Sequence, residues 1–282
     1  MSDKPLALDL CSGFGGWAEG LEAEGWDVIR VDIVDMFTET GTLKPPNCLL
    51  MLQDIRTFHG SQAKRCSLIV ASPPCTEYSW MAMPWSRAKQ VARALRGENE
   101  FPANYRGSRT IERLNALFDA CFRIQREASE AAGHHIPLIV ENVKGAQPWV
   151  GRARWHYGSF YLWGDVPALM PSSLRRKVPG MNFHEHEKTG KPGRSFQSAA
   201  VEGVKQRGRG AAWFDKALDE RCKEATEVKN GGDWFGPGSN CSLQRRSSSG
   251  STSRKAASAQ IAKIPYTLAS HIARVYYPKD GD

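Results

Sequence analysis

The 282-residue sequence has no long apolar run and no recognisable leader. A transmembrane helix needs about 20 consecutive apolar residues, so we expect no membrane span and no membrane partner. The first residues, MSDKPLALDL, lack the charged-then-apolar layout of a signal peptide, because their short apolar part runs directly into a glycine-rich turn. We therefore expect a cytoplasmic protein.

Cysteine is present without the spacing that would give it a structural role. The seven cysteines form no CxxC pair, and their odd number argues against a disulfide framework or a structural zinc site. His184 and His186 form an HxH pair without nearby cysteines, so a solvated loop competes with a metal site there, and no metal is expected. Reduced thiols in a reducing compartment fit this pattern best.

The positive charge is confined to one part of the chain. Residues 172–255 hold 17 Lys and Arg against 9 Asp and Glu, whereas the remainder holds 21 of each, so the whole net charge of +8 lies in this segment. Lys and Arg supply the sequence-independent part of nucleic-acid affinity. The segment is therefore either a phosphate-binding surface or a solvated basic surface.

Residues 6–145 read as alternating strands and helices. Short apolar runs predict strands at LALDL, DVIRVDI, LLMLQDI, SLIVASPP and IPLIVENV, the third being the weakest because LLML also suits a helix end. The clearest helix is predicted over 108–132, where apolar residues recur on one side after a Ser108 cap. This alternation predicts an α/β fold with a parallel sheet and right-handed crossovers.

From about residue 165 the pattern changes. Gly, Pro, Ser and basic residues dominate, with one possible helix over 211–229, and helical patterning resumes over 259–277. We predict a catalytic domain formed by residues 1–165 and 254–282, with a smaller irregular lobe, residues 166–253, inserted before the final helix.

The first chemical motif is a glycine-rich turn, DLCSGFGG, which begins at Asp9. It follows a strand and opens a helix, so backbone there can approach a ligand closely, although a purely structural turn would look the same. Asp32, at the end of the second strand, is placed to bind the two hydroxyls of a ribose, and Asp54 follows the third strand at the same edge. Because no GxxxxGK[ST] is present, a nucleoside cofactor without a triphosphate fits.

The second motif pairs SPPC, after strand four, with ENV, at the end of strand five. Neighbouring parallel strands would bring Cys75 and Glu141 to one rim. A thiolate beside a carboxyl group suits attack on an electron-poor ring whose nitrogen must be protonated. Taken singly, a cysteine such as Cys75 is more often a buried thiol than a nucleophile, and an acid such as Glu141 is more often a surface or capping residue. Their joint position at strand ends, together with the glycine turn, favours catalysis.

Together these segments resemble the cytosine-C5 DNA methyltransferases of prokaryotic or phage type. The family signatures DLFxGxGG, an acid after strand two, DI after strand three, PCQxFS and ENV occur here in order over residues 6–145 as DLCSGFGG, Asp32, Asp54-Ile55, PPCTEYS and ENV. The resemblance resumes more weakly over 254–275. It implies a Rossmann-like S-adenosylmethionine methyltransferase domain with a small target-recognition lobe before the C-terminal helix.

The resemblance also implies roles for the cofactor-binding residues. S-adenosyl-L-methionine, or a close sulfonium analogue, would be lined by the first motif, the ribose held by Asp32 and the adenine amine by Asp54. The expected cofactor-binding residues are Asp9, Cys11, Ser12, Gly13, Phe14, Gly15, Gly16, Asp32, Ile33, Asp54, Ile55, Pro74 and Ser258. The family's GN dipeptide before the last helix is replaced here by Ala257-Ser258.

By the same resemblance, the target cytosine would be flipped out of double-stranded DNA. Cys75 would attack C6, Glu141 would protonate N3, and two arginines would support the base. Arg152 and Arg154 are our choice for these arginines, because a strand-like run follows them, and Gln206-Arg207-Gly208-Arg209 is the competing match. The expected DNA-binding residues are Thr76, Tyr78 and Ser79 in the loop that closes over DNA, and Lys205, Arg207, Arg209, Arg245 and Arg246 in the lobe.

Several alternatives stay open at the level of sequence. One branch of the family methylates tRNA with the same motifs, the transferred group could be a modified one-carbon unit, and a silent DNA-binding regulator could retain the fold. Intact Cys75 and Glu141 argue against the regulator, since neither is needed for binding alone. We expect a monomer.

Overall fold

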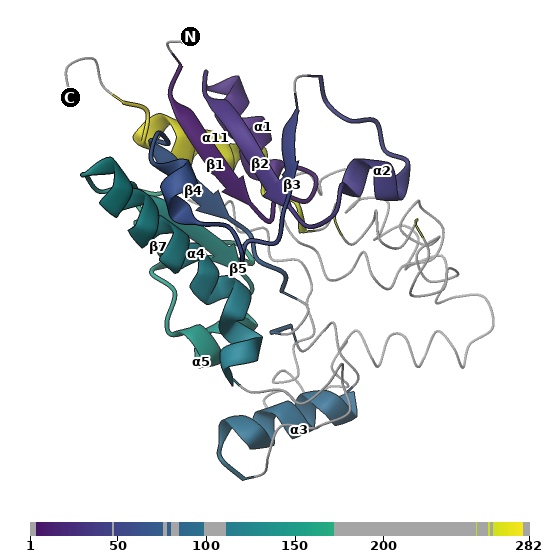
Figure 1. Ribbon diagram of the computed structural model, residues 1–282. Coiled ribbons are helices and arrows are strands. Elements are labelled where there is room, and N and C mark those ends of the chain that lie inside the picture. The colour runs from purple at the N-terminus through teal and green to yellow at the C-terminus, as the bar shows by residue number, and fades with distance from the viewer. Residues whose placement is uncertain are drawn as a thin grey trace, which may run out of the picture. The chain divides into compact units, whose positions relative to one another are not determined.

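The computed structural model describes residues 4–46, 48–75, 78–79, 85–98, 111–171 and 262–278, together with the single residues 252 and 259 (Figure 1). The strands are β1 (Leu6–Leu10), β2 (Asp27–Asp32), β3 (Leu49–Leu52), β4 (Leu68–Ala71), β5 (Leu138–Asn142), β6 (Trp155–Tyr157) and β7 (Phe160–Gly164). The α-helices are α1 (Gly16–Ala23), α2 (Met36–Thr40), α3 (Trp85–Leu95), α4 (Ile111–Ala132), α5 (Gln147–Val150) and α11 (Tyr266–Val275), and the short 3-10 helices are η1 (Gly60–Ala63) and η3 (Lys144–Ala146).

The seven strands form one sheet in the order β3-β2-β1-β4-β5-β7-β6. Strands β1 to β5 are mutually parallel, while β7 runs antiparallel to both β5 and β6. The chain first builds outward from β1 to β3 and then crosses back to place β4 on the other side of β1, so the strand order reverses between β1 and β4. The predicted Rossmann-like α/β fold is confirmed, and this reversal is where such sheets bind ligands.

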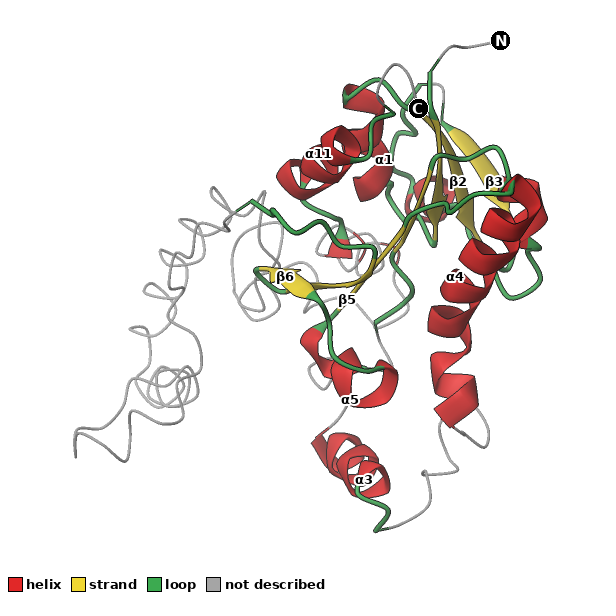
Figure 2. Ribbon diagram, turned by 90° about the vertical axis from the view of Figure 1, so that its left-hand side faces the viewer, coloured by secondary structure: helices red, strands yellow, loops and turns green. Residues whose placement is uncertain are grey.

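Helices cover both faces of the sheet (Figure 2). Because successive strand residues point to opposite faces, Leu8 and Leu10 pack into the apolar core beneath α4, whereas Ala7 packs into the core beneath α1 and α11. The strands are therefore buried on both sides, and this explains the runs of apolar residues that predicted them.

Helix α4 is the long helix of one face. The helix predicted over 108–132 is present over Ile111–Ala132, with residues 108–110 outside the described part of the chain. Its buried residues recur at helical spacing and pack against the sheet: Phe118, Cys121, Ile124 and Ala128.

Several helices differ from the sequence-based expectation, and α2 and α5 are among those that were not predicted. The final helix is shorter than the patterning over 259–277 suggested: α11 begins at Tyr266 directly after Pro265, because proline has no N–H for an earlier helical hydrogen bond and restricts the residue before it. Helix α3, over Trp85–Leu95, was not predicted. β3, the most weakly predicted strand, is confirmed as an edge strand with exposed Leu49 and Leu52.

The chain divides into two units, one formed by residues 1–172 and 262–282 and the other by residues 173–261. Apart from Thr252 and Ala259, the second unit lies outside the described residues. Val166 and Met170 pack against the core beneath α1 and α11, so the chain up to this point accompanies the first unit. The boundaries of the inserted lobe stay a prediction.

No helix within the described ranges is long and apolar enough to cross a membrane. The described residues also contain no cluster of three metal-ligating side chains, and His184 and His186 lie outside them. Among the cysteines that the structure describes, none forms a disulfide.

Candidate active site

The predicted site residues of the first domain gather at the carboxyl edge of the parallel strands. Ladder register fixes this arrangement, because Leu10 pairs with both Val31 and Ala71, and Ala71 in turn pairs with Val140. The four central strands therefore end at one level. Directly beyond them lie the glycine turn after β1, Asp32 at the end of β2, Cys75 after β4 and Glu141 near the end of β5.

The glycine turn is closed by backbone hydrogen bonds that join it to β2. Ser12 N–H donates to the carbonyl of Val31 at 3.2 Å, and Gly15 N–H donates to the carbonyl of Ser12 at 2.6 Å. Gly13 N–H donates to the Asp32 carboxylate at 2.9 Å, so the acid expected to bind a ribose also fixes the turn. Cys11 adopts a left-handed backbone conformation with φ of 56°, which is uncommon for a residue other than glycine.

Gly15, the N-cap of α1, is required for two separate reasons. Its φ of 71° lies in the left-handed region, and a Cβ atom there would come within 2.4 Å of the Arg30 Nη1 atom. Arg30 is only 2% exposed and pairs with Glu22 at 2.8 Å. A buried guanidinium thus supports the underside of the turn, and any side chain at position 15 would displace it.

Asp9 is the most unusual charged group at this edge. It is fully buried and is the register partner of Arg30, yet neither of its carboxylate oxygens has a hydrogen-bond partner among the described residues. Burial raises its pKa to about 8, opposed by the nearby Arg30 and reinforced by Asp32. The backbone N–H of Ala18, in the first turn of α1, also lowers the pKa, although it does not meet the geometry of a hydrogen bond.

A buried acid with two unpartnered oxygens next to a glycine turn fits a ligand that carries a positive charge. Such a ligand would satisfy the oxygens and lower the pKa of the carboxyl group. The amino acid part of S-adenosylmethionine carries an ammonium group, so Asp9 and this turn fit that cofactor.

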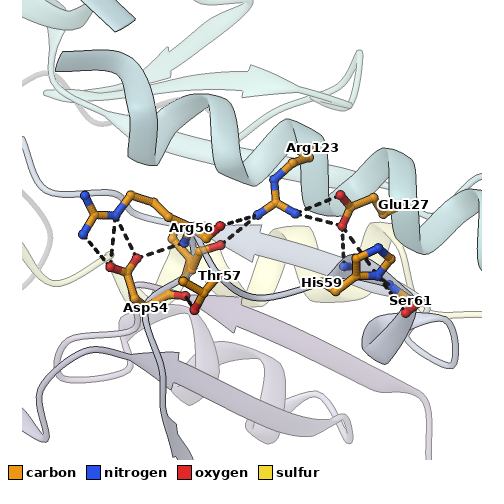
Figure 3. A network of polar contacts seen from close by, with 9 residues as sticks. Asp54, Arg56, Thr57, His59, Ser61, Arg123 and Glu127 are labelled. Carbon is orange, nitrogen blue, oxygen red and sulfur yellow. Dashed lines mark hydrogen bonds and ion pairs between the residues drawn. The ribbon is translucent and has the colours of Figure 1, made fainter. Parts of the chain in front are cut away.

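Asp54 follows β3 and is held by its neighbour Arg56 (Figure 3). The Arg56 guanidinium donates to both carboxylate oxygens, with Nε at 3.0 Å from each, and the Arg56 backbone N–H donates to Oδ1 at 2.9 Å. These hydrogen bonds lower the pKa of Asp54. The next residue, Ile55, is 2% exposed, so its side chain belongs to the core and only its backbone can face a ligand.

The turn that carries Cys75 is fixed from both sides. Asn142, the middle residue of ENV, is fully buried and donates from Nδ2 to the carbonyl of Pro73 at 2.9 Å. The backbone N–H groups of Tyr78 and Ser79 donate to the carbonyl of Cys75 at 3.0 and 2.9 Å, so the chain folds back directly after the thiol.

Trp17 of α1 donates from Nε1 to the hydroxyl of Ser72 at 3.0 Å. This hydrogen bond joins the Cys75 turn to the helix that follows the glycine turn.

Glu141 lies on β5, and the two chosen arginines lie in the loop between α5 and β6. Glu141 is 3% exposed and pairs in register with Leu162 of β7. The backbone N–H of Arg154 donates to the carbonyl of Leu162 at 2.8 Å, at the start of β6. Arg152 and Arg154 are both exposed and lie two residues apart in this loop.

Tyr78 takes a position that contact with DNA would not allow. Its side chain is 2% exposed, and its hydroxyl contacts the carbonyl of Leu114 at 3.2 Å and Asn115 Oδ1 at 3.1 Å, both on α4. The ring is therefore part of the core, because a phenol with these two acceptors available is stabilised by burial. Ser79 is partly exposed.

The remaining predicted residues divide into two groups. Phe14 is partly exposed and packs against Phe37 of α2 with ring centroids 5.3 Å apart, while Ile33 is 66% exposed beside Asp32. The following residues lie outside the described part of the chain: Thr76, Lys205, Arg207, Arg209, Arg245, Arg246 and Ser258, as does the alternative Gln206–Arg209 match.

Sequence reasoning missed the groups that support the site from below. Arg30 interrupts the apolar strand DVIRVD, and a charge within a strand of this type is a usable signal for a buried ionic contact. Asn115, Arg123 and Glu127 on α4 gave no comparable signal, since polar residues at these spacings are equally typical of a solvated helix face.

The protein-family models and curated proteins compared with this sequence contain no match. Solved structures do resemble it at low similarity. A DNA modification methyltransferase encoded within an E. coli prophage shares 20% identity with a TM-score of 0.33, covering 51% of this chain and 33% of that chain. The S. pombe Dnmt2 methyltransferase shares 17% identity with a TM-score of 0.32, covering 51% of this chain and 36% of that chain.

The Entamoeba histolytica methyltransferase EhMeth shares 14% identity with a TM-score of 0.34, covering 53% of this chain and 41% of its own. This chain thus spans well under half the length of each of these three structures. At these identities and TM-scores the likeness assigns no activity to it.

Proposed function

We propose that this protein transfers a methyl group from S-adenosylmethionine to C5 of a cytosine in double-stranded DNA. The observation that carries the proposal is the hydrogen bond from Asn142 to the Pro73 carbonyl. It joins the turn of Cys75 to the strand of Glu141 at the carboxyl edge of the sheet, next to the reversal of strand order between β1 and β4. This contact supports the proposal because it would fix the proposed nucleophile and the proposed acid beside the turn that we propose for a nucleoside cofactor.

The cofactor would be held by groups from three strands. Asp9 would accept from its ammonium group, Asp32 from the ribose hydroxyls and Asp54 from the adenine amine, with the glycine turn against the amino acid part. When bound, S-adenosylmethionine supplies an electrophilic methyl group. The exposed Ile33 lies next to Asp32 and could cover one side of the adenine ring.

The chain's own residues would activate the base. The Cys75 thiolate forms a bond to C6 while Glu141 gives a proton to N3, so the electron pair of the 5,6 double bond becomes available at C5. Arg152 and Arg154 would hold the base through its carbonyl oxygen. After C5 has gained its new carbon substituent, water would take the C5 proton and Glu141 would take back the N3 proton. The electron pair of the C5–H bond then restores the 5,6 double bond, and Cys75 leaves C6 as the thiolate.

Duplex DNA is proposed as the substrate because of the basic segment. Residues 172–255 carry 17 Lys and Arg against 9 Asp and Glu, and such a local excess suits a phosphate backbone. A base inside a duplex must be flipped out to reach Cys75, and a separate lobe that binds the DNA backbone would support this step. We propose that the protein acts as a monomer.

Transfer of labelled methyl groups tests the proposal. The chain is incubated with labelled S-adenosylmethionine and either mixed-sequence duplex DNA or total tRNA, and the modified base is identified by mass spectrometry. We expect 5-methylcytosine in DNA and none with Cys75→Ser. Label in tRNA alone would overturn the DNA assignment. Binding of DNA without labelling of either substrate would identify a regulator.

A further inference from the structure

Helix α4 contacts both halves of the candidate active site, although it contributes no residue to either half's chemistry. Its second half holds the loop that carries Asp54, and its first half holds the turn that carries Cys75. Each contact is made by polar side chains that are otherwise unexplained on a core helix.

The contact with the Asp54 loop is centred on Arg123 (Figure 3). The Arg123 guanidinium donates from Nη2 to the carbonyls of Ile55 at 3.0 Å and Arg56 at 3.3 Å. Its Nη1 donates to both oxygens of Glu127, at 2.9 and 2.8 Å, and Glu127 in turn accepts from the backbone N–H of Gly60 at 2.6 Å. One ion pair thus fixes three backbone groups between residues 55 and 60.

Close packing makes this contact specific. A Cβ atom at Gly60 would come within 2.1 Å of the carbonyl oxygen of Ile124, so the loop backbone lies directly against α4. Ile55 and Phe58 are each 2% exposed and belong to the same apolar core as Ile124. The loop after β3 can therefore shift only together with α4.

The contact with the Cys75 turn is centred on Asn115. The Tyr78 hydroxyl donates to Asn115 Oδ1 at 3.1 Å, and Asn115 Nδ2 donates to the carbonyl of Trp149 at 2.9 Å. Asn115 is 8% exposed. It consequently links the segment after Cys75 with α5, which follows the ENV strand.

The two contacts are separated by eight residues, or about 12 Å along a helix that rises ~1.5 Å per residue. Eight residues amount to about 2.2 helical turns, so the two contacts lie about 80° apart around the helix axis. The helix begins at Ile111, while residues 80–84, which follow the Cys75 turn, and 99–110 lie outside the described chain.

We propose that α4 is the positioning element of the active site, with two separate ends. Arg123, with Glu127, positions the Asp54 loop and so sets the recognition of the adenine amine, whereas Asn115, with Tyr78, positions the Cys75 turn and so sets the reactivity of the nucleophile. Neither end contacts the substrates. The assignment rests on the proposed function, because it takes Asp54 as the adenine acceptor and Cys75 as the nucleophile.

The Arg123 end is tested by ligand binding. Arg123→Met and Arg123→Lys are compared with Arg126→Met, which removes an exposed charge from the same helix. Calorimetry measures the affinity for S-adenosylhomocysteine and for S-inosylhomocysteine, in which a carbonyl oxygen replaces the adenine amine. We expect Arg123→Met to weaken S-adenosylhomocysteine binding by about tenfold and to reduce the preference over the inosyl analogue, with partial recovery in Arg123→Lys and no change in Arg126→Met.

The Asn115 end is tested by thiol chemistry. Tyr78→Phe and Asn115→Ala are compared with Asp119→Asn, which changes an exposed side chain of α4. Alkylation by iodoacetamide is followed by mass spectrometry on the peptide that contains Cys75, and S-adenosylhomocysteine affinity is measured on the same samples. We expect a change of about threefold or more in the alkylation rate of Cys75 for the two variants, unchanged affinity, and wild-type behaviour of Asp119→Asn.

The two sets of results separate the possible failures. If the native chain binds S-adenosylhomocysteine and the variants at both ends change affinity and alkylation alike, α4 is only a structural helix and the proposal is overturned. The same holds if neither property changes. If the native chain does not bind S-adenosylhomocysteine at all, the cofactor assignment fails and the role of Arg123 fails with it. Melting temperatures of all variants, measured in parallel, identify any loss of affinity that comes from unfolding.

Discussion

The two halves of the candidate site are stabilised by different kinds of interaction. The half formed by β1 to β3 contains buried or half-buried ionisable groups. They are Asp9, which has no hydrogen-bond partner among the described residues, Arg30, which lies beneath Gly15, and Asp54, which accepts hydrogen bonds from Arg56. The turn after β4 is held by neutral hydrogen bonds, from Asn142 to Pro73 and from Tyr78 to Asn115. A buried carboxyl group without a partner suits a half that must gain a positively charged ligand, whereas neutral hydrogen bonds suit a half that must hold a nucleophile in place.

Replacement of the nucleophile should have the largest effect and should affect one half alone. Cys75→Ser is expected to lower turnover by at least ~10³-fold, because a hydroxyl is a far weaker nucleophile than a thiolate at neutral pH. The affinity for S-adenosylhomocysteine should stay within about twofold of the native value. Turnover is measured by methyl transfer and affinity by calorimetry. Turnover that survives the substitution would remove Cys75 from the mechanism.

Glu141→Gln should cause the next largest decrease in turnover. The amide cannot give a proton to N3, so we expect kcat to fall by ~10²–10⁴-fold, the range for loss of a general acid. Steady-state kinetics should show an unchanged KM for S-adenosylmethionine, since Glu141 lies in the other half. A large increase in that KM with little change in kcat would place Glu141 in the cofactor site instead.

Asp9 should make stability depend on pH in the neutral range. Its pKa of about 8 in the folded chain exceeds the ordinary value of 3.8, so the folded state holds the extra proton between these values. The Asp9 contribution is therefore fully present below about pH 4 and is lost as pH rises to about 8, by at most ~1.4 kcal/mol per pH unit.

Chemical denaturation at pH 6 and pH 8.5 measures this dependence. The native chain should lose stability over this interval relative to Asp9→Asn, which has no proton to release. Asp54 and Glu127 do not interfere, since their pKa values are lowered below 3.8 and 4.5 and they titrate in acid. Parallel pH profiles of the two proteins would contradict the account of a buried, unpartnered acid.

The smallest of these effects is expected at the hydrogen bond that joins the Cys75 turn to β5. Asn142→Ala leaves the carbonyl of Pro73 without its donor, and such a loss costs about 1–3 kcal/mol in a buried site. We expect that decrease in unfolding free energy, together with slower alkylation of Cys75 than in the native chain. If the unfolding free energy falls by this amount while the alkylation rate of Cys75 stays unchanged, the hydrogen bond stabilises the fold without positioning the thiol.

Local pattern predicted the strands and the residues at their ends, because apolar runs and glycine turns are properties of neighbouring residues. Cys75, Glu141, Asp32 and Asp54 were placed at one edge by this reasoning, and the described structure brings them there. Pro265 shows how a single residue limits a helix that amphipathic patterning alone would extend.

Contacts between distant segments were not predictable in the same way. The burial of Tyr78 depends on Leu114 and Asn115, 36 and 37 residues away, and Arg123 reaches carbonyls 67 and 68 residues away. Nothing within either segment indicates these partners, since the packing of α4 on the sheet creates them. The edge strand β3 was weakly predicted for a related reason, because its exposed leucines lack the alternation that a half-buried strand shows.

Covalent trapping tests the central claim most directly. Duplex DNA that contains 5-fluorocytosine is incubated with the chain and S-adenosylmethionine, and the complex is digested and sequenced by mass spectrometry. Fluorine at C5 cannot leave as a proton does, so the bond between the Cys75 sulfur and C6 of the base should persist. The account predicts one cross-linked peptide, the one that contains Cys75, and none from Cys75→Ser. A cross-link at another residue, or an adduct that survives the substitution, would contradict it.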